Sequence, residues 1–133
     1  MIVIDTSAII AIATNEPDAR RLIKTINAQD ELLISAATLT ELLVVAARKG
    51  ALQEVEEFLR DFGHRTTDVT EDLTRRAGAA YLQWGKGFHP AGLNFGDYFA
   101  YALAKERDCP LLFIGNDFSK TDIKPALAPE SDA

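Results

Sequence analysis

The sequence predicts an α/β protein with a parallel sheet that is covered by helices on both faces. Three short runs carry this prediction: Met1–Ile4, Leu32–Ser35 and Leu111–Ile114. Each run is almost wholly apolar, as in strands that are buried on both sides. Segments with helical periodicity separate them, and this alternation is typical of parallel strands that are joined by helices.

The helices are expected from the spacing of apolar residues and from helix-stop signals. They are predicted at Ser7–Ala13, from the turn at 15–18 to about Ala28, and at Ala36–Lys49, Leu52–Phe62, Glu71–Trp84 and Phe95–Arg107. Gly50 and Gly63 end two of them, as glycine commonly does. In the last helix, Phe95, Phe99 and Leu103 recur at intervals of four and are expected to face the core.

Arg65–Val69 could form a further, short polar strand. Residues 85–92 (GKGFHPAG) are expected to form a loop, and residues 115–122 a sharp turn. The 133 residues are expected to form one domain, with a loose tail over about 125–133, where Pro125 and Pro129 lie.

The charge balance argues against a protein that binds nucleic acid through a basic stripe. There are 20 acidic and 14 basic residues, the net charge is −6 and the isoelectric point is near 4.8. The objection weakens if acids gather to hold divalent cations, because the metal reverses the local sign of charge. No signal peptide or long apolar run is recognisable, so a cytoplasmic location is expected.

Four acids are placed where they can meet. Asp5 directly follows the first strand, Glu41 lies in the helix after the second, and Asp117 follows the third strand by a few residues. Asp97 lies at the start of the Phe95 helix. Since ligands of such sheets bind beyond the carboxyl ends of the strands, these side chains are expected at one edge.

Each acid taken singly also has an ordinary structural role open to it. Asp5 could cap the next helix, and Glu41 could close a capping box that begins at Thr38. Asp97 suits the positive end of its helix, and Asp117 could close an Asx turn.

The conjunction of four carboxylates favours a metal site. Two unit charges about 4 Å apart repel by about 4 kcal/mol at an effective dielectric near 20. A fold that is stable by only ~5–15 kcal/mol would not retain such a cluster without a counter-charge. Mg²⁺ and Mn²⁺ bind through oxygen and would supply it, whereas no His and Cys set for zinc is present.

Four segments resemble the signature segments of PIN-domain ribonucleases, and more narrowly of VapC-type toxins of bacterial toxin–antitoxin pairs. They are MIVIDTSAII, SAATLTELLVVAARKG, NFGDYFAYALAKE and LLFIGNDFSKTDI. The resemblance runs from Met1 to about Ile123. It implies a three-layer α/β/α domain with a parallel sheet of about five strands, in which Arg65–Val69 and the residues around Ile123 must supply the strands beyond the three clear runs. It also implies a metal-dependent endoribonuclease that cleaves tRNA, rRNA or mRNA, and a homodimer.

The resemblance also implies roles for the four acids. Asp5, Glu41, Asp97 and Asp117 match the acidic quartet of the family. Asp5, Asp97 and Asp117 would hold Mg²⁺, for which Mn²⁺ can substitute, and Glu41 would position metal or water. The fourth acid varies most across the family.

Other residues near the quartet match supporting positions. Thr6 and Ser7 are the hydroxyls that usually follow the first aspartate and support it through hydrogen bonds. Asn116 or Asp122 could share the role of the fourth acid.

A partner and RNA contacts are implied as well. VapC-type toxins are neutralised by a small VapB-type antitoxin, in a heterotetramer or larger assembly. The helices that carry Leu39, Leu43 and the 52–59 stripe offer apolar surface for it. The candidates for RNA contact are basic residues in loops near the acids: Lys86, His89 and Lys120.

Two other classes of function stay open at this stage. One is a degenerate PIN domain that binds without cutting. The other is a phosphoacceptor module of the receiver type, but receivers carry an acidic pair after the first strand, where this chain has Thr6 and Ser7. Ser7 also stands where haloacid dehalogenase phosphatases need a second aspartate.

Overall fold

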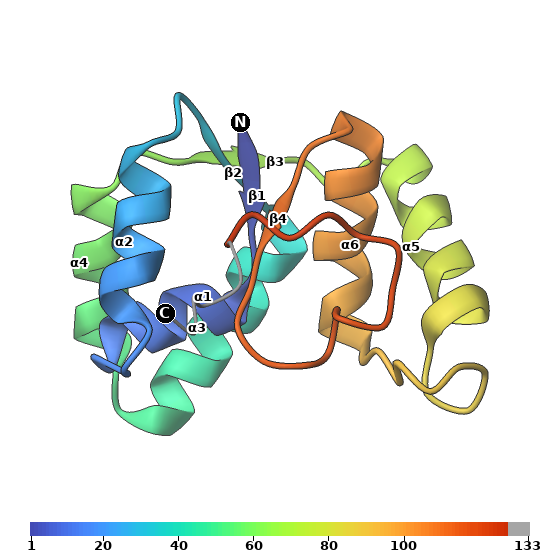
Figure 1. The fold of residues 1–133 in the computed structure, drawn as a ribbon, viewed down its shortest axis with the longest axis horizontal. Coiled ribbons are helices and arrows are strands. Elements are labelled where there is room, and N and C mark those ends of the chain that lie inside the picture. Colours follow the sequence, from blue (N-terminus) through green and yellow to red (C-terminus); the bar gives the residue numbers. More distant parts are fainter. Residues whose placement is uncertain (128–133) are drawn as a thin grey trace, which may run out of the picture.

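Four parallel strands lie between two layers of helices in the computed structural model, which describes residues 1–127 (Figure 1). The strands are β1 (Ile2–Ile4), β2 (Leu32–Ser35), β3 (Arg65–Thr67) and β4 (Leu111–Leu112), in the order β3-β2-β1-β4. The helices are α1 (Thr6–Ala13), α2 (Ala19–Asn27), α3 (Ala36–Lys49), α4 (Leu52–Asp61), α5 (Glu71–Trp84) and α6 (Phe95–Arg107). The predicted three-layer α/β/α fold is confirmed.

Alternate residues of the strands enter two separate cores. Ile2, Ile4 and Ile34 pack against α1 to α4 on one face of the sheet. Val3 and Leu33 pack against α5 and α6 on the other face, which Figure 1 shows at the right. Burial on both faces explains why these strands read as continuous apolar runs.

The fifth strand is absent from the described residues. The segment near Ile123 makes one isolated parallel bridge, between Leu111 and Pro125, and Ala126 donates its N–H to the Leu111 carbonyl. Pro125 has no N–H to extend a ladder, which is why no longer strand forms there. Lys124, Pro125 and Ala126 therefore lie along β4, although a loose tail is predicted from about residue 125. Pro129 and the other residues of 128–133 lie outside the described part of the chain.

The expected core face of α6 is wrong at its first turn. Leu103 is buried and Phe99 is half-buried, but Phe95 is 76% exposed. Because α6 is covered by the sheet on one side and α5 on the other, Tyr98 and Tyr101 are buried as well. The buried surface of this helix is therefore wider than one stripe at intervals of four residues.

No helix within residues 1–127 combines the length and hydropathy needed to cross a bilayer.

Candidate active site at the carboxyl edge of the sheet

Asp5 lies between β1 and α1 and is the N-cap residue of α1. Its backbone is extended, and its Oδ2 accepts hydrogen bonds from the Ser7 N–H at 3.0 Å and the Ser7 hydroxyl at 2.7 Å. The simple N-cap role is thus present, but it engages only one carboxylate oxygen. The other oxygen, Oδ1, is buried and has no hydrogen-bond partner among the described residues.

Burial dominates the electrostatics of Asp5. It raises the pKa of this carboxyl from 3.8 to about 6, against the opposing effect of the hydrogen bonds from Ser7. The charge of Glu41 raises the pKa further. A buried carboxylate with one unused oxygen and a raised pKa is stabilised strongly by a cation.

Ser7 also joins Asp5 to the far end of the chain. Its Oγ accepts a hydrogen bond from the Ile114 N–H at 3.1 Å, across 107 positions in the sequence. This bond lies where the chain leaves β4 and begins the loop that carries Asp117. The predicted supporting role of Ser7 is thus accompanied by a definite contact.

Glu41 is held in place by α1. The Thr6 hydroxyl donates a hydrogen bond of 2.6 Å to Glu41 Oε1. The alternative capping box is wrong, because α3 begins at Ala36 and is capped by Ser35, so that Thr38 lies inside the helix. With no helix end to cap, the Glu41 carboxylate turns toward α1 and α6.

Close packing between α3 and α6 depends on Gly96. A Cβ atom at this position would lie 1.7 Å from Glu41 Oε2. Any larger residue would therefore displace the carboxylate. Gly96 is a functional residue that the sequence prediction missed; the signal for it is a glycine within a helix, immediately before Asp97, which indicates a close approach of neighbouring atoms.

Asp97 lies in the first turn of α6 and is 8% exposed. Its Oδ2 accepts the Asn94 N–H at 2.9 Å, so the predicted helix-end role is present. Burial is the largest influence on its carboxyl and raises the pKa to about 7. The Asn94 hydrogen bond opposes this shift, and the charges of Asp5, Asp117 and Glu41 add to it.

The fourth acid lies in an exposed loop. Asn116 and Asp117 are both exposed, and the charge of Asp117 reaches Asp97. All four predicted acids thus share one edge of the sheet. No three His, Cys, Asp or Glu side chains within residues 1–127 are already close enough to form a complete metal cage. Mg²⁺ commonly uses one or two carboxylates and several waters, so such a cage is not required.

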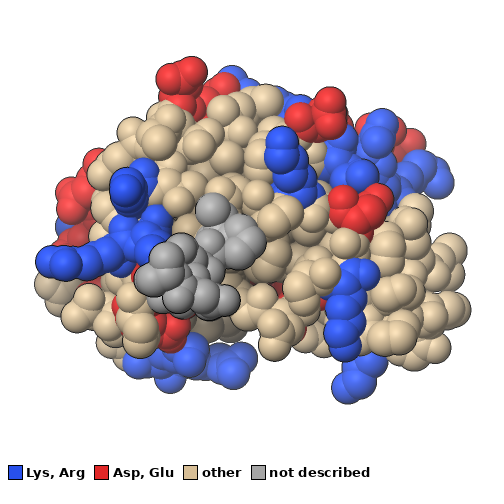
Figure 2. Space-filling model, in the orientation of Figure 1, with Lys and Arg blue, Asp and Glu red and all other residues tan. Residues whose placement is uncertain are grey.

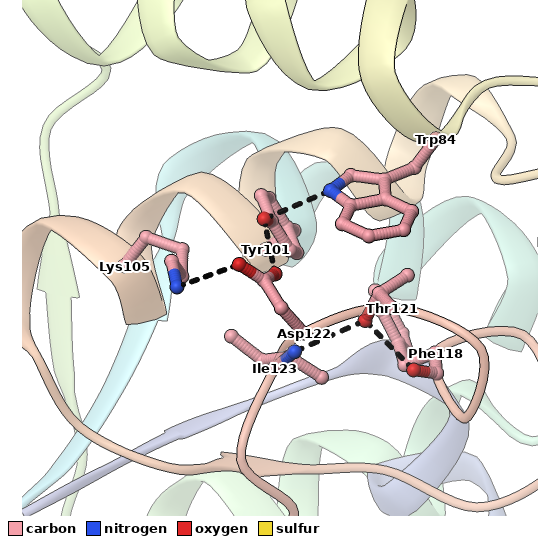
Figure 3. Close-up of polar contacts among 7 residues, drawn as sticks. All are labelled: Trp84, Tyr101, Lys105, Phe118, Thr121, Asp122 and Ile123. Atoms are coloured by element: carbon pink, nitrogen blue, oxygen red, sulfur yellow. Dashed lines mark hydrogen bonds and ion pairs between the residues drawn. The ribbon is translucent and has the colours of Figure 1, made fainter.

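Asp122 is engaged elsewhere. The Tyr101 hydroxyl donates to Asp122 Oδ1 and Lys105 Nζ donates to Asp122 Oδ2, as Figure 3 shows. Tyr101 and Lys105 are one and two turns along α6 from Asp97, or about 6 and 12 Å at 1.5 Å per residue. Asp122 is therefore not brought together with the quartet.

The candidate RNA-contact residues lie in two loops beside the acids. Lys86 and Lys120 are exposed. His89 is half-buried, with its ring 4.7 Å from that of Trp84 and its Nδ1 accepting the Ala91 N–H. The ring of His89 therefore has a structural role in its own loop.

Comparisons with known proteins agree with this architecture. The family described as PIN domain matches residues 2–124. "Ribonuclease VapC30" of Mycobacterium tuberculosis is 43% identical over 130 residues, which cover 96% of this chain and 99% of that protein. This chain belongs to the PIN-domain family of VapC ribonucleases. "Ribonuclease VapC42" of the same species, another member, is 39% identical and covers 93% of this chain and 98% of its own.

Solved structures of VapC proteins share the fold. VapC20 of Mycobacterium tuberculosis, described as a toxin that cleaves the sarcin-ricin loop, superposes with a TM-score of 0.75 at 16% identity, over 92% of this chain and 96% of its own. VapBC2 from Rickettsia felis, bound to a promoter DNA fragment, gives 0.70 at 14% identity, over 94% and 96%. At these identities the likeness concerns the fold.

Proposed function

We propose that this VapC-family endoribonuclease cleaves RNA with a divalent metal held by Asp5, Asp97 and Asp117, and acts as the toxin of a toxin–antitoxin module. One observation carries the proposal. Two buried carboxyls with raised pKa values, Asp5 and Asp97, share a sheet edge with Glu41 and Asp117. The charge of Glu41 raises the pKa of both, and the charge of Asp117 raises that of Asp97. A degenerate domain that only binds its partner has no use for this costly arrangement, so that alternative is not favoured.

The residues present fit a hard cation. The buried Oδ1 of Asp5, which has no hydrogen-bond partner within residues 1–127, is available as a ligand. The other proposed donors are also carboxylate oxygens. Oxygen donors without Cys or His suit Mg²⁺ or Mn²⁺. When bound, such a metal lowers the pKa of a water and neutralises charge on the phosphate.

The protein side chains position the reacting groups. Asp5 and Asp97 would hold the metal, with their remaining oxygens fixed by Ser7 and Asn94. Glu41, held by Thr6, would orient the attacking water or accept its proton.

RNA binding is proposed to depend on the metal and on a few loop residues. Figure 2 shows basic side chains spread around one face of the molecule and interleaved with acidic ones, rather than gathered in a stripe. Lys86, His89 and Lys120 are proposed to contact the RNA backbone beside the acids, with Asn116 supporting Asp117. RNA bound in this way would lose affinity with added salt less steeply than RNA held by many lysines.

The proposed protein partners are a VapB-type antitoxin and a second copy of the chain. A structural neighbour described as a toxin–antitoxin complex from Klebsiella pneumoniae, with a TM-score of 0.68 at 18% identity, supports the antitoxin. For the homodimer, an apolar groove of about 640 Å³ lies between α3 and α6, with Val44 54% and Phe95 76% exposed beside it. Antitoxin binding is proposed on α3 and α4, where Leu52 is 43% exposed.

Cleavage of RNA by the purified protein tests the function. Cleavage should require Mg²⁺ or Mn²⁺, stop with chelator, and be lost in Asp5→Asn and Asp97→Asn. Asp18→Asn, which changes the half-buried acid that precedes α2 and pairs with Arg21, should cleave normally. Chelator-resistant cleavage, or full activity of both site variants, would reject the metal-site assignment. Growth arrest on expression, relieved by a co-expressed antitoxin, tests the toxin role.

A further inference from the structure

A chain of hydrogen bonds joins the middle and the C-terminal part of α6 to the end of α5 and to the loop after β4. Trp84 Nε1, at the end of α5, donates to the Tyr101 hydroxyl at 2.9 Å. The same hydroxyl donates to Asp122 Oδ1 at 2.5 Å, and Lys105 Nζ lies 3.0 Å from Asp122 Oδ2. Figure 3 shows Tyr101 between the indole and the carboxylate.

Asp122 belongs to the loop that carries the fourth acid. This loop leaves β4 after Leu112, exposes Asn116 and Asp117, and returns to the core at Ile123. Phe118, which follows Asp117, is buried and packs on Phe113. The loop thus has apolar anchors, but these do not fix how far its exposed part stands from α6.

Two further bonds make the Asp122 end of the loop stiff. Thr121 Oγ1 donates to the Phe118 carbonyl and accepts the Ile123 N–H, so the backbone on both sides of Asp122 is held (Figure 3). Movement at Asp122 would therefore be transmitted to Phe118 and to its neighbour Asp117.

Of the two contacts that Asp122 makes with α6, the hydrogen bond from Tyr101 is the stronger. Lys105 and Asp122 have side chains that are 45% and 46% exposed, and an ion pair of that kind contributes little to stability. Tyr101 is 6% exposed and donates to a charged acceptor, a stronger class of hydrogen bond. Burial would raise the pKa of Asp122, but the bonds from Tyr101 and Lys105 hold it below its usual range, so this acceptor is charged at neutral pH.

Tyr101 lies on the same face of α6 as Asp97. The two residues are four positions apart, which places one above the other on the helix. A bond from Tyr101 to the loop therefore sets the loop against the helix face that presents Asp97.

We propose that Tyr101 and Asp122 are positioning residues that hold the 113–122 loop against α6 and so fix Asp117 relative to Asp97. Through Trp84 the same hydroxyl also holds the start of the 85–92 loop. This inference rests on the proposed metal-dependent cleavage, because the distance between two acids matters only if they share a metal.

The test combines a metal titration with a spectroscopic reading. Tyr101→Phe removes the hydroxyl and keeps the ring, and Asp122→Ala removes the acceptor. Both should raise the Mn²⁺ concentration for half-maximal RNA cleavage by about tenfold, the loss expected for one charge-assisted hydrogen bond, with KM for RNA little changed. Trp84 is the sole tryptophan, so its emission should shift in Tyr101→Phe without any metal or RNA.

Two controls separate the positioning of Asp117 from a general loss of protein stability. Tyr98→Phe removes another buried hydroxyl of α6, which donates to the Leu93 carbonyl and does not touch the loop, and it should leave the Mn²⁺ requirement unchanged. In an Asp117→Ala background, Tyr101→Phe should add no further loss, since the group that it positions is gone.

The outcomes distinguish this inference from the proposed function. Suppose that the native protein cleaves with Mn²⁺. The positioning role is then overturned, and the proposed function stands, in any of three cases: Tyr101→Phe needs no more Mn²⁺ than the native protein, Tyr98→Phe raises the Mn²⁺ requirement as much as Tyr101→Phe does, or the losses from Tyr101→Phe and Asp117→Ala add. If the native protein needs no metal, the proposed function fails, and the inference falls with it whatever the Trp84 emission shows.

Discussion

The Thr6 hydroxyl lies 2.6 Å from Glu41 Oε1 and joins the start of α1 to the middle of α3, across 35 positions of sequence. Thr6 is 8% exposed, so this bond lies at the inner wall of the candidate site. It holds the Glu41 carboxylate close enough to Asp5 for the Glu41 charge to raise the Asp5 pKa.

Replacing this hydroxyl should impair cleavage more than folding. Thr6→Val keeps the shape of the side chain and loses the hydrogen bond to a charged group, whose net value is typically about 1.5–3 kcal/mol. We expect cleavage to fall about tenfold. Thr6→Ser retains the donor and should stay within about threefold of the native rate. Equal rates for the Val variant and the native protein would contradict a positioning role for Thr6.

Gly96→Ala should displace Glu41 without unfolding the protein. The added Cβ would lie 1.7 Å from Glu41 Oε2, which is the mobile end of a long side chain and can move away. Cleavage should fall by about tenfold or more, because the bond to Thr6 is broken.

A glycine on α5 is the matched control for Gly96. A Cβ at Gly78 would meet nothing within 4 Å. Gly78→Ala should therefore leave cleavage unchanged and raise the free energy of unfolding by about 0.5–1 kcal/mol. If Gly96→Ala cleaves as well as Gly78→Ala, the close approach of Glu41 to α6 is irrelevant to catalysis.

The metal-free protein should become less stable as the pH rises from about 4 to 7. Burial raises the pKa of Asp97 to about 7 and of Asp5 to about 6, whereas both would be near 3.8 in the unfolded chain. In this window the folded state binds more protons than the unfolded state, so the contribution of these groups to stability falls with rising pH.

Asp97→Asn should remove the contribution of Asp97 to this pH-dependent loss of stability. At pH 7.5, without metal, it should raise the free energy of unfolding on the order of 1–3 kcal/mol relative to the native protein. Urea unfolding at pH 5 and pH 7.5 measures this difference, which should be smaller at pH 5. If Asp97→Asn were less stable than the native protein at pH 7.5, the charged Asp97 carboxylate would not destabilise the folded state, contrary to this prediction.

Phe95→Glu should separate the proposed dimer. Phe95 is 76% exposed and borders the groove between α3 and α6, so a charge there would be buried on association. Light scattering should give the mass of a dimer for the native protein and of a monomer for the variant. Leu82→Glu, which changes a residue of α5 that is 64% exposed and outside the groove, should remain a dimer.

Much of the fold was readable because both faces of the sheet are buried. Such strands appear as apolar runs, and the bounds of β2, α3, α5 and α6 agree with those predicted. The spacing of apolar residues predicts burial less well in a helix such as α6, where the buried surface is wider than one stripe of residues. Phe95 looks like a core residue by its spacing, but it lies in the first turn of α6 and is exposed.

The acids of the site were recognisable by type and place, while their partners were not. A carboxylate after a strand is visible in the sequence, and Asp5, Glu41 and Asp97 do come to one edge. The contacts that hold them, from Thr6 to Glu41 and from Ser7 to Ile114, join segments far apart in the chain. No local pattern reports such distant pairs.

Asp122 shows the same limit. By sequence it could share the role of Asp117, because both are acids after β4. Only packing reveals that Tyr101 and Lys105 occupy its two oxygens.

Binding of Mn²⁺ to the purified protein, followed by electron paramagnetic resonance of the free ion, tests most directly whether these carboxylates share a metal. The native protein should bind Mn²⁺ in competition with Mg²⁺, and more tightly as the pH rises from 6 to 8, because Asp5 and Asp97 must lose protons. Asp97→Asn should weaken binding by about tenfold or more, whereas Asp108→Asn at the other end of α6 should not. Absence of binding at millimolar Mn²⁺, or binding that is the same in Asp97→Asn, would contradict the account.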